Sequence, residues 1–200
     1  MIAIIDYGMG NLYSLSQALL RLDHEFVITD DTETIKNADK LILPGVGAFG
    51  DAMVELKGRG LAKVITEEAI AGKPLLGICL GMQLLFTSSD EHGYFSGLNL
   101  LAGHVEKMSM DLPIPHMGWN WLSFRHPHPL LGSLEEGHVY FVHSYHVKAT
   151  NAEDVIATTD YSEEITAIVA RNNIIGMQFH PEKSGPLGIQ LLHQFAKGRI

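Results

Sequence analysis

The stretch Gly72–Phe86, GKPLLGICLGMQLLF, holds the chain's only cysteine at a point where the hydrophobic pattern changes. The run PLLGI (74–78) is short and apolar, as in a buried strand, whereas LGMQLLF (80–86) has the spacing that begins a helix. Cys79 therefore lies at a predicted junction between a strand and a helix. It is placed two residues from a glycine on either side, a pattern that favours a sharp turn because small residues relieve crowding in a strained backbone.

Outward from this stretch, short apolar runs alternate with amphipathic segments through the first hundred residues. The other expected strands are 2–5, 25–29 and 40–45, and the expected helices are 11–22, 31–38 and 51–71, the last with a break at 58–60. Strands that alternate with helices favour a parallel sheet covered on both faces.

Beyond residue 100 the pattern changes to closely spaced β-rich runs that leave no room for crossover helices. Several of these strands should therefore pair antiparallel, and a helix over 185–198 closes the chain. The sequence thus predicts one α/β domain over residues 1–200, with a mixed, mostly parallel sheet flanked by helices.

Composition indicates which binding partners and which cellular compartment this chain is expected to have. The net charge is −9, with 14 Lys and Arg against 23 Asp and Glu, and no basic cluster that would favour nucleic acid. We find no cationic leader and no apolar run near the roughly 20 residues of a membrane helix. One cysteine forms no intrachain disulfide, which is typical of a reducing compartment, so a soluble, cytoplasmic protein is expected.

Cys79 is a candidate nucleophile because of where the pattern places it. The carboxyl edge of a parallel sheet is where open α/β folds build their sites. Gly77, Cys79 and Gly81 form a Gly-x-Cys-x-Gly pattern like a nucleophile elbow, and the positive end of the following helix favours a thiolate. The Leu80 amide is free to donate to an oxyanion. The alternative, a buried structural cysteine, fits this stretch about equally well.

A second stretch, GMQFHPEKS (176–184), supplies possible partners for the thiol. Pro181 disfavours helix at His180, and residues two apart in an extended chain point the same way. Glu182 should therefore reach the imidazole of His180 and orient it, as in a nucleophile–base–orienter triad. The alternative is an ordinary polar turn after a strand.

Taken together, GICLGMQ, the downstream FHPE and the segments PGVGAFG, PHMGWN and YFVHSYH resemble the class I glutamine amidotransferases over the whole chain. The resemblance implies a flavodoxin-like fold and hydrolysis of glutamine to glutamate and ammonia. It implies Cys79 as nucleophile, His180 as acid and base, and Glu182 as orienter. It implies an oxyanion site built from backbone amides at Val46, Gly47 and Leu80, and glutamine contacts at Gln83, His143, Ser144 and Tyr145.

Within the family, HMGWN (116–120) and the short chain resemble the members that serve histidine biosynthesis. The resemblance then implies a heterodimer with a (β/α)₈-barrel cyclase subunit that uses the ammonia to close an imidazole ring. Asn11, Trp119 and Lys183 are candidate contacts with that subunit. Their plainer roles are an N-cap, a core aromatic and a solvated cation, and for Trp119 alone the core is favoured.

Other functions stay open from sequence. The chain has eleven histidines, and two segments hold two each: HPHP (126–129), expected in a surface loop, and HSYH (143–146). Neither segment has the residue spacing of a known metal site, so no metal is predicted. No cofactor is expected. The rival enzymes are a glutaminase for anthranilate, aminodeoxychorismate, purine or pyridoxal phosphate synthesis, and a general cysteine hydrolase or peptidase. The remaining rival is a non-catalytic regulatory subunit with the same fold.

Overall fold

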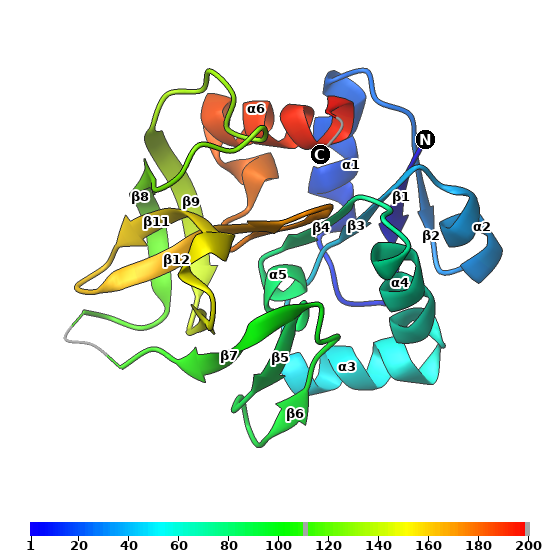
Figure 1. Ribbon diagram of the computed structural model, residues 1–200, viewed down its shortest axis with the longest axis horizontal. Coiled ribbons are helices and arrows are strands. Elements are labelled where there is room, and N and C mark those ends of the chain that lie inside the picture. Colours follow the sequence, from blue (N-terminus) through cyan, green and yellow to red (C-terminus); the bar gives the residue numbers. More distant parts are fainter. Residues whose placement is uncertain (110–111, 199–200) are drawn as a thin grey trace.

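A nine-stranded sheet runs through the middle of the molecule in the order β2-β1-β3-β4-β13-β12-β11-β8-β9 (Figure 1). The computed structural model describes residues 1–109 and 112–198. The first five strands in this order are parallel neighbours and the remaining pairings are antiparallel, so the predicted mixed sheet flanked by helices is confirmed, and β13 from the C-terminal part joins its parallel half. The strands of the large sheet are β1 (Ile2–Ile5), β2 (Phe26–Thr29), β3 (Lys40–Leu43), β4 (Leu75–Ile78), β8 (His116–Phe124), β9 (Gly137–His143), β11 (Val155–Asp160), β12 (Glu164–Arg171) and β13 (Ile174–Met177).

Helices cover both faces of the sheet, as the alternating pattern predicted. On one face α1 packs beside α6, and on the other lie α2 to α5 (Figure 1). Each face of the sheet has its own hydrophobic core, and alternate residues of a buried strand point into one or the other. In β1, Ile2 and Ile4 pack on the side of α1 and α6, whereas Ala3 and Ile5 pack on the side of α2 to α5. The helices are α1 (Leu12–Arg21), α2 (Thr32–Asn37), α3 (Phe49–Gly58), α4 (Leu61–Ile70), α5 (Leu80–Leu84) and α6 (Gly185–Lys197), with single 3-10 turns η1 (Ala152–Asp154) and η2 (Pro181–Lys183).

The expected break between α3 and α4 falls where the sequence placed it. Gly60 lies there with φ of +72°, in the left-handed region that a side chain would disfavour. The N-caps of α1 and α2 are Asn11 and Asp31, whose side chains accept from the amides of Ser14 and Thr34.

A second, four-stranded sheet differs from the sequence prediction. It has the order β10-β7-β5-β6 and consists of β5 (Phe86–Ser89), β6 (Phe95–Ser96), β7 (Leu101–Lys107) and β10 (Tyr145–Ala149). The helix expected from residue 80 onward ends at Leu84, and Phe86 already begins β5. The run 138–147 is likewise divided at Ser144 into β9 and β10, which belong to different sheets.

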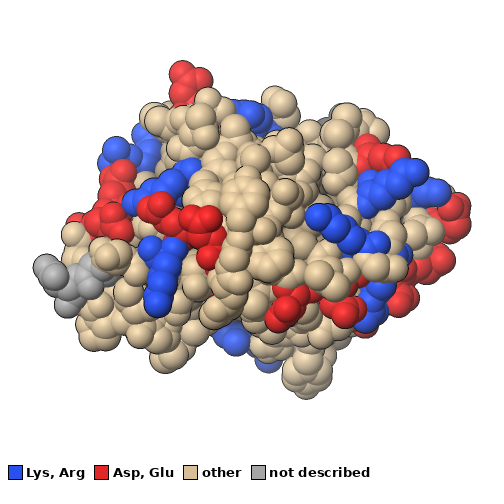
Figure 2. All heavy atoms as spheres, turned by 90° about the horizontal axis from the view of Figure 1, so that it is seen from below, with Lys and Arg blue, Asp and Glu red and all other residues tan. Residues whose placement is uncertain are grey.

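Charges on the face seen from the small sheet gather toward its two ends, with uncharged side chains between them (Figure 2). Blue and red residues are interspersed at both ends, so this face carries no extended patch of one sign. Among the residues described, no helix is long and apolar enough to cross a membrane.

Candidate active site

Cys79 stands in a strained turn at the carboxyl end of β4. Its backbone has φ of 55° and ψ of −113°, a conformation that L-residues rarely adopt. A Cβ atom at Gly77 would lie 2.6 Å from the Gly81 carbonyl oxygen, and one at Gly81 would overlap the Leu43 carbonyl oxygen. The glycines on either side are therefore required by close backbone packing, which explains the pattern seen in the sequence.

His180 is brought beside Cys79 because β4 and β13 are parallel neighbours. Ile78 pairs with Met177 at the ends of the two strands, and the Cys79 amide extends the ladder by donating to the Met177 carbonyl at 2.8 Å. His180 follows three residues later, with its own amide donating to the Tyr140 carbonyl at 3.2 Å. Two segments far apart in sequence thus meet at one sheet edge.

Glu182 lies behind His180 and contacts its ring. The His180 Nδ1 to Glu182 Oε1 distance is 2.9 Å, and the two side chains are only 4% and 2% exposed. Because a carboxylate only accepts, Nδ1 carries the proton and Nε2 is left for the thiol. The predicted contact is confirmed, but the predicted backbone is partly wrong: only His180 is extended, and residues from Pro181 onward form the turn η2.

The charges and hydrogen bonds around His180 favour its protonated form. Burial lowers the pKa of His180, but hydrogen bonds to Cys79 and Glu182, and the negative charges of both, outweigh burial and hold the pKa well above its ordinary value. Nearby, burial first and the charge of Cys79 second raise the pKa of Tyr7. Tyr7 stays a neutral phenol and donates to the Pro44 carbonyl at 2.9 Å.

A pocket of about 270 Å³ opens in front of Cys79 and His180, close to the small end of the range for small-molecule sites. It gathers all of the residues that the sequence analysis assigned to glutamine and the oxyanion: Val46, Gly47, Leu80, Gln83, His143, Ser144 and Tyr145. The HSY segment reaches the pocket because the chain crosses from β9 to β10 at Ser144.

The backbone amides predicted for the oxyanion site differ in their availability. Leu80 is the first residue of α5, so its amide has no partner within the helix. The Val46 amide already donates to the Met9 carbonyl at 3.3 Å. Val46 therefore offers no free N–H to the pocket in this conformation, and the neighbouring Gly47, with φ of +99°, is the other backbone group beside Cys79.

The side chain of Gln83 is held by hydrogen bonds from its amide nitrogen. Its amide nitrogen donates to the Tyr145 carbonyl at 3.0 Å and to Gln178 Oε1 at 3.1 Å. Both amide hydrogens are thus used inside the protein, which leaves the Gln83 Oε1 as the group that can accept from a ligand.

Two residues of the site were missed from sequence. Glu91 lines the pocket, and its Oε2 accepts from the Phe49 amide at 2.7 Å, capping the first turn of α3. Ser184 Oγ donates to the His180 carbonyl at 2.6 Å and accepts from the Tyr140 amide at 2.9 Å. Ser184 comes just before a helical pattern, where a serine predicts an N-cap, but its side chain makes no capping hydrogen bond with α6 and bonds His180 and Tyr140 instead. Glu91 lies in a polar segment with no such signal.

The candidate partner contacts lie near the turn η2. Asn11 lines a small crevice with Glu182, and Lys183 is exposed. The Trp119 ring approaches Gly185 at the start of α6 and is 54% exposed. The expectation that Trp119 alone is a core residue is therefore wrong, because the outward face of β8 at this point is not covered.

The histidine-rich segments lie apart from one another. His126 and His128 are in the loop between β8 and β9, as expected, whereas His143 faces the pocket and His146 is buried near Glu106 and Glu163. Within residues 1–109 and 112–198, no three histidine, cysteine or acidic side chains gather as metal ligands.

The chain belongs to the class I glutamine amidotransferases, because the family model "Glutamine amidotransferase class-I" matches residues 3–198. The resemblance inferred from sequence is thereby confirmed, and with it glutaminase activity. The chain is 54% identical over 202 residues to the imidazole glycerol phosphate synthase subunit HisH of Geobacillus sp. (strain WCH70), covering 98% of this chain and 96% of that protein. It is 47% identical over 203 residues to the same-named subunit of Bacillus subtilis (strain 168), covering 98% and 96%.

Solved structures share the fold. The structure titled "Crystal structure of glutamine amidotransferase" superimposes with a TM-score of 0.77 at 18% identity, covering 98% of this chain and 97% of that one. The structure of PurLQS from Thermotoga maritima gives a TM-score of 0.74 at 20% identity, covering 97% and 96%.

Proposed function

We propose that this chain is the glutaminase subunit of an imidazole glycerol phosphate synthase and releases ammonia from glutamine for a cyclase subunit. The observation that carries the proposal is the row of Cys79, His180 and Glu182 beside one pocket. The names of the relatives, at about half identity over nearly the whole chain, support the particular pathway. We propose that one amidotransferase domain spans residues 1–200.

The first half of the reaction forms a thioester. The Cys79 thiolate attacks the side-chain carboxamide carbon of glutamine, and the C=O π electrons move to the oxygen. The His180 imidazolium gives its Nε2 proton to the amide nitrogen as the C–N bond breaks, so ammonia leaves and the carbonyl re-forms. Glu182 keeps the proton on Nδ1 and so directs Nε2 toward the reacting atoms.

The second half hydrolyses the thioester. Neutral His180 takes a proton from water, the resulting hydroxide attacks the thioester carbon, and collapse of the intermediate expels the Cys79 thiolate with glutamate as product. The Leu80 amide and a second amide at Gly47 or Val46 stabilise the oxyanion in both halves, and the Val46 amide must first leave the Met9 carbonyl. One such donor is typically worth about 3 kcal/mol of barrier.

Glutamine binding follows from the polar groups of the pocket. We assign the substrate's α-ammonium to the Gln83 Oε1 and the Glu91 carboxylate, because these are acceptors that line the pocket. The backbone and side chains of His143, Ser144 and Tyr145 border the same space and would receive the α-carboxylate. Ammonia would be lost as ammonium in bulk water, which favours its use by a partner docked at the pocket.

That partner is proposed to be a (β/α)₈-barrel cyclase subunit, and the two chains form a heterodimer. The lyase activity of the complex belongs to the cyclase subunit. Asn11, Trp119 and Lys183 are the proposed contacts: Lys183 is part of the turn that carries Glu182, Asn11 lines a crevice with Glu182, and the Trp119 ring lies near Gly185 just after the turn. We also propose a cytoplasmic location, because Cys79 must remain a free thiol and reducing compartments preserve free thiols.

The test is glutamate release from glutamine by the purified chain, alone and with a barrel-type cyclase subunit and its ribonucleotide ligand. The Cys79→Ala variant is the matched control. Activity that rises strongly with the cyclase and disappears in the control supports the whole proposal. Full activity that the cyclase does not change would retain the glutaminase and overturn this partner, whereas no glutamate under any condition would overturn the catalytic assignment.

A further inference from the structure

His116 and His143 face each other at the pocket end of β8 and β9. The antiparallel register pairs the two residues directly, and His116 Nδ1 lies 3.0 Å from His143 Nε2. Both are buried, at 0% and 6% exposure. A pair of imidazoles in direct contact inside a protein must share its protons in a defined way, because each ring nitrogen is either a donor or an acceptor.

The two ends of this row are acceptors. His143 Nδ1 lies 2.8 Å from the Tyr145 carbonyl oxygen, so Nδ1 must carry the hydrogen. At the other end His116 Nε2 lies 2.9 Å from Asn120 Oδ1. The Asn120 amide is oriented by its Nδ2, which donates to the Asp160 carbonyl at 3.2 Å.

Proton counting then fixes the tautomer of His116. Burial lowers the pKa of His143 to about 3, and burial also lowers that of His116 against a hydrogen bond with Asn120 that raises it; a neutral pair holds two protons. One is on His143 Nδ1. Because His143 Nε2 can then only accept, the other must be on His116 Nδ1. The contact between His116 Nε2 and Asn120 is left without a hydrogen unless the pair gains a third proton.

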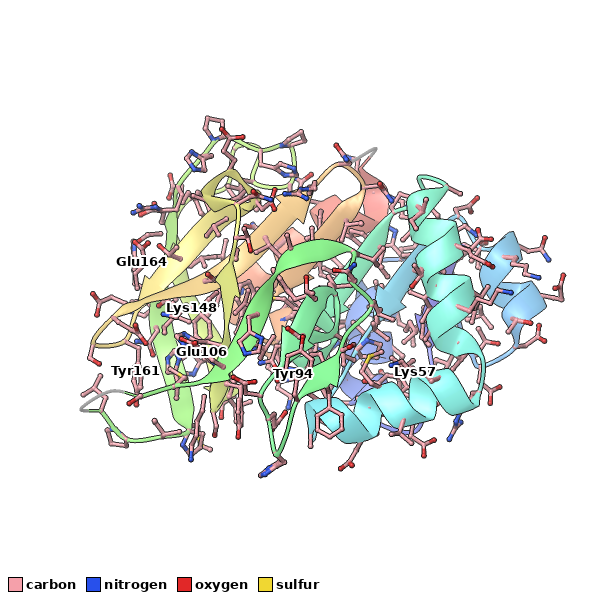
Figure 3. The ribbon with its side chains drawn as sticks, turned by 60° about the horizontal axis from the view of Figure 1, so that its bottom comes forward. Lys57, Tyr94, Glu106, Lys148, Tyr161 and Glu164 are labelled. Atoms are coloured by element: carbon pink, nitrogen blue, oxygen red, sulfur yellow. The ribbon has the colours of Figure 1, made fainter. Side chains whose placement is uncertain are left out.

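The His116 ring is held in one plane by aromatic neighbours. Phe141 stacks on it with ring centroids 4.7 Å apart, and Tyr161, labelled in Figure 3, stacks with centroids 4.0 Å apart. The Tyr161 hydroxyl is itself tied to the Pro113 carbonyl at 2.7 Å. His116 is thus a rigid donor pointed at His143.

What His143 holds is the wall of the glutamine pocket. The Tyr145 carbonyl accepts from His143 Nδ1 at 2.8 Å and from the Gln83 amide at 3.0 Å, so two side chains fix the peptide that follows Ser144. If His143 exchanged its tautomer, its Nδ1 would become an acceptor facing an acceptor, and this anchor would be lost.

We propose that His116 is a positioning residue for glutamine binding, which fixes His143 in the tautomer that anchors residues 143–145. This inference rests on the proposed glutaminase function. It predicts that loss of the His116 donor weakens glutamine binding while the chemistry at Cys79 continues.

The experiment compares three variants in the complex with the cyclase subunit. His116→Phe keeps a flat ring between Phe141 and Tyr161 but removes the donor. His116→Asn keeps an amide N–H close to the place of Nδ1. His138→Phe changes an exposed histidine of β9 and is the matched control. NMR of ¹⁵N-labelled histidine in the wild-type chain reads the tautomer of His143 without any activity.

We expect His116→Phe to raise the KM for glutamine about tenfold, the cost of about one buried hydrogen bond, with kcat within about twofold. His116→Asn should restore most of the loss and His138→Phe should change neither constant. An unchanged KM in folded His116→Phe, or a His143 proton found on Nε2, would overturn the inference. A wild-type complex that releases no glutamate would instead overturn the proposed function, and the NMR tautomer would then decide the role of the pair.

A fourth variant tests the proton count. Asn120→Asp places a carboxylate against His116 Nε2, so the pair should bind its third proton near neutral pH and show it by NMR. The titratable groups around His143 are His116, His146 and His180, and those beside His116 are His143 and Tyr161. A pair that stays neutral in this variant would overturn the assigned hydrogen-bond directions.

Discussion

Two regions of this chain bring a nucleophilic side chain, a histidine and a carboxylate together. One is the Cys79 site. The other lies on the small sheet, where Ser88 Oγ is 2.9 Å from His104 Nδ1, and His104 Nε2 is 2.8 Å from Asp90 Oδ2. By residue type and by the distance between histidine and carboxylate, the second row matches the first.

Their surroundings differ. The Asp90 side chain is 62% exposed and that of His104 is 31% exposed, whereas those of Glu182 and His180 are 2% and 4% exposed. A carboxylate in water stabilises a neighbouring imidazolium weakly, because solvent screens the charge.

The backbones differ as well. Ser88 lies within β5, in register with Ser96 on one side and His104 on the other, so its backbone serves the sheet ladder. Cys79 lies in a strained turn with the Leu80 amide beside it and a pocket in front. The comparison teaches that a catalytic site needs a place for the oxyanion and the substrate as well as three aligned side chains.

The largest expected difference is in the nucleophiles. Cys79→Ala should lower glutamine turnover by a factor on the order of 10⁴ or more, because the thioester path is lost. Ser88→Ala should leave turnover within about twofold. Steady-state assays of both variants with the cyclase subunit check this, and a comparable loss in the two variants would contradict the view that only the Cys79 site is catalytic.

The carboxylates should differ next. Glu182→Gln should lower kcat by roughly 10³-fold, because the amide stabilises a charged His180 poorly and permits the wrong tautomer. Asp90→Asn, the matched change on the small sheet, should have no effect on kcat. If Glu182→Gln kept the wild-type kcat, Glu182 would not be the orienting group.

The pair of His180 and Glu182 should link folding to pH. The pKa of His180 in the folded chain lies above its ordinary value of 6.5. Its stabilisation is therefore complete below about pH 6.5 and is lost as the pH rises through the folded pKa. Between about pH 6 and pH 9, urea unfolding should show the wild type losing more stability than Glu182→Gln. Parallel curves for the two proteins would contradict the linkage.

The smallest effect should come from the Ser88 hydrogen bond. Ser88→Ala removes a partner of His104 from a largely buried position, so the free energy of unfolding should fall by about 1 kcal/mol. Ser96→Ala, on the exposed neighbouring strand, is the control and should change it by less. Urea titration measures both, and a Ser88 variant as stable as the wild type would show that this row contributes nothing even to the fold.

The sequence sufficed for the parts of the fold and site that local pattern controls. The strand–turn–helix at Cys79 follows from hydrophobic period and paired glycines. The Glu182 contact was expected from its spacing to His180, although the turn η2 rather than an extended chain brings it about. The adjacency of Cys79 and His180 depends on β13 entering the sheet beside β4, which was a matter of family resemblance because strand order has no local signal.

Other features depended on contacts between distant segments. Glu91 caps α3 through the Phe49 amide, and Ala48, at the N-cap position, has no capping side chain that would have revealed the need. Trp119 alternates on β8 like a core residue, and only the arrangement of neighbouring elements leaves it exposed. The small sheet was missed because β5 and β6 are short and lie within a polar stretch.

The central place of β13 has a consequence for the order in which the enzyme becomes competent during synthesis. The strand is the last of the nine strands of this sheet along the chain, yet it sits between β4 and β12 and completes the middle of the sheet. A nascent chain that ends before Ile174 already holds the thiol but has neither its base nor its orienting acid. Glutamine is therefore not hydrolysed by a chain that ends before His180, and the capacity to release ammonia arises only once β13 and the turn η2 have been made.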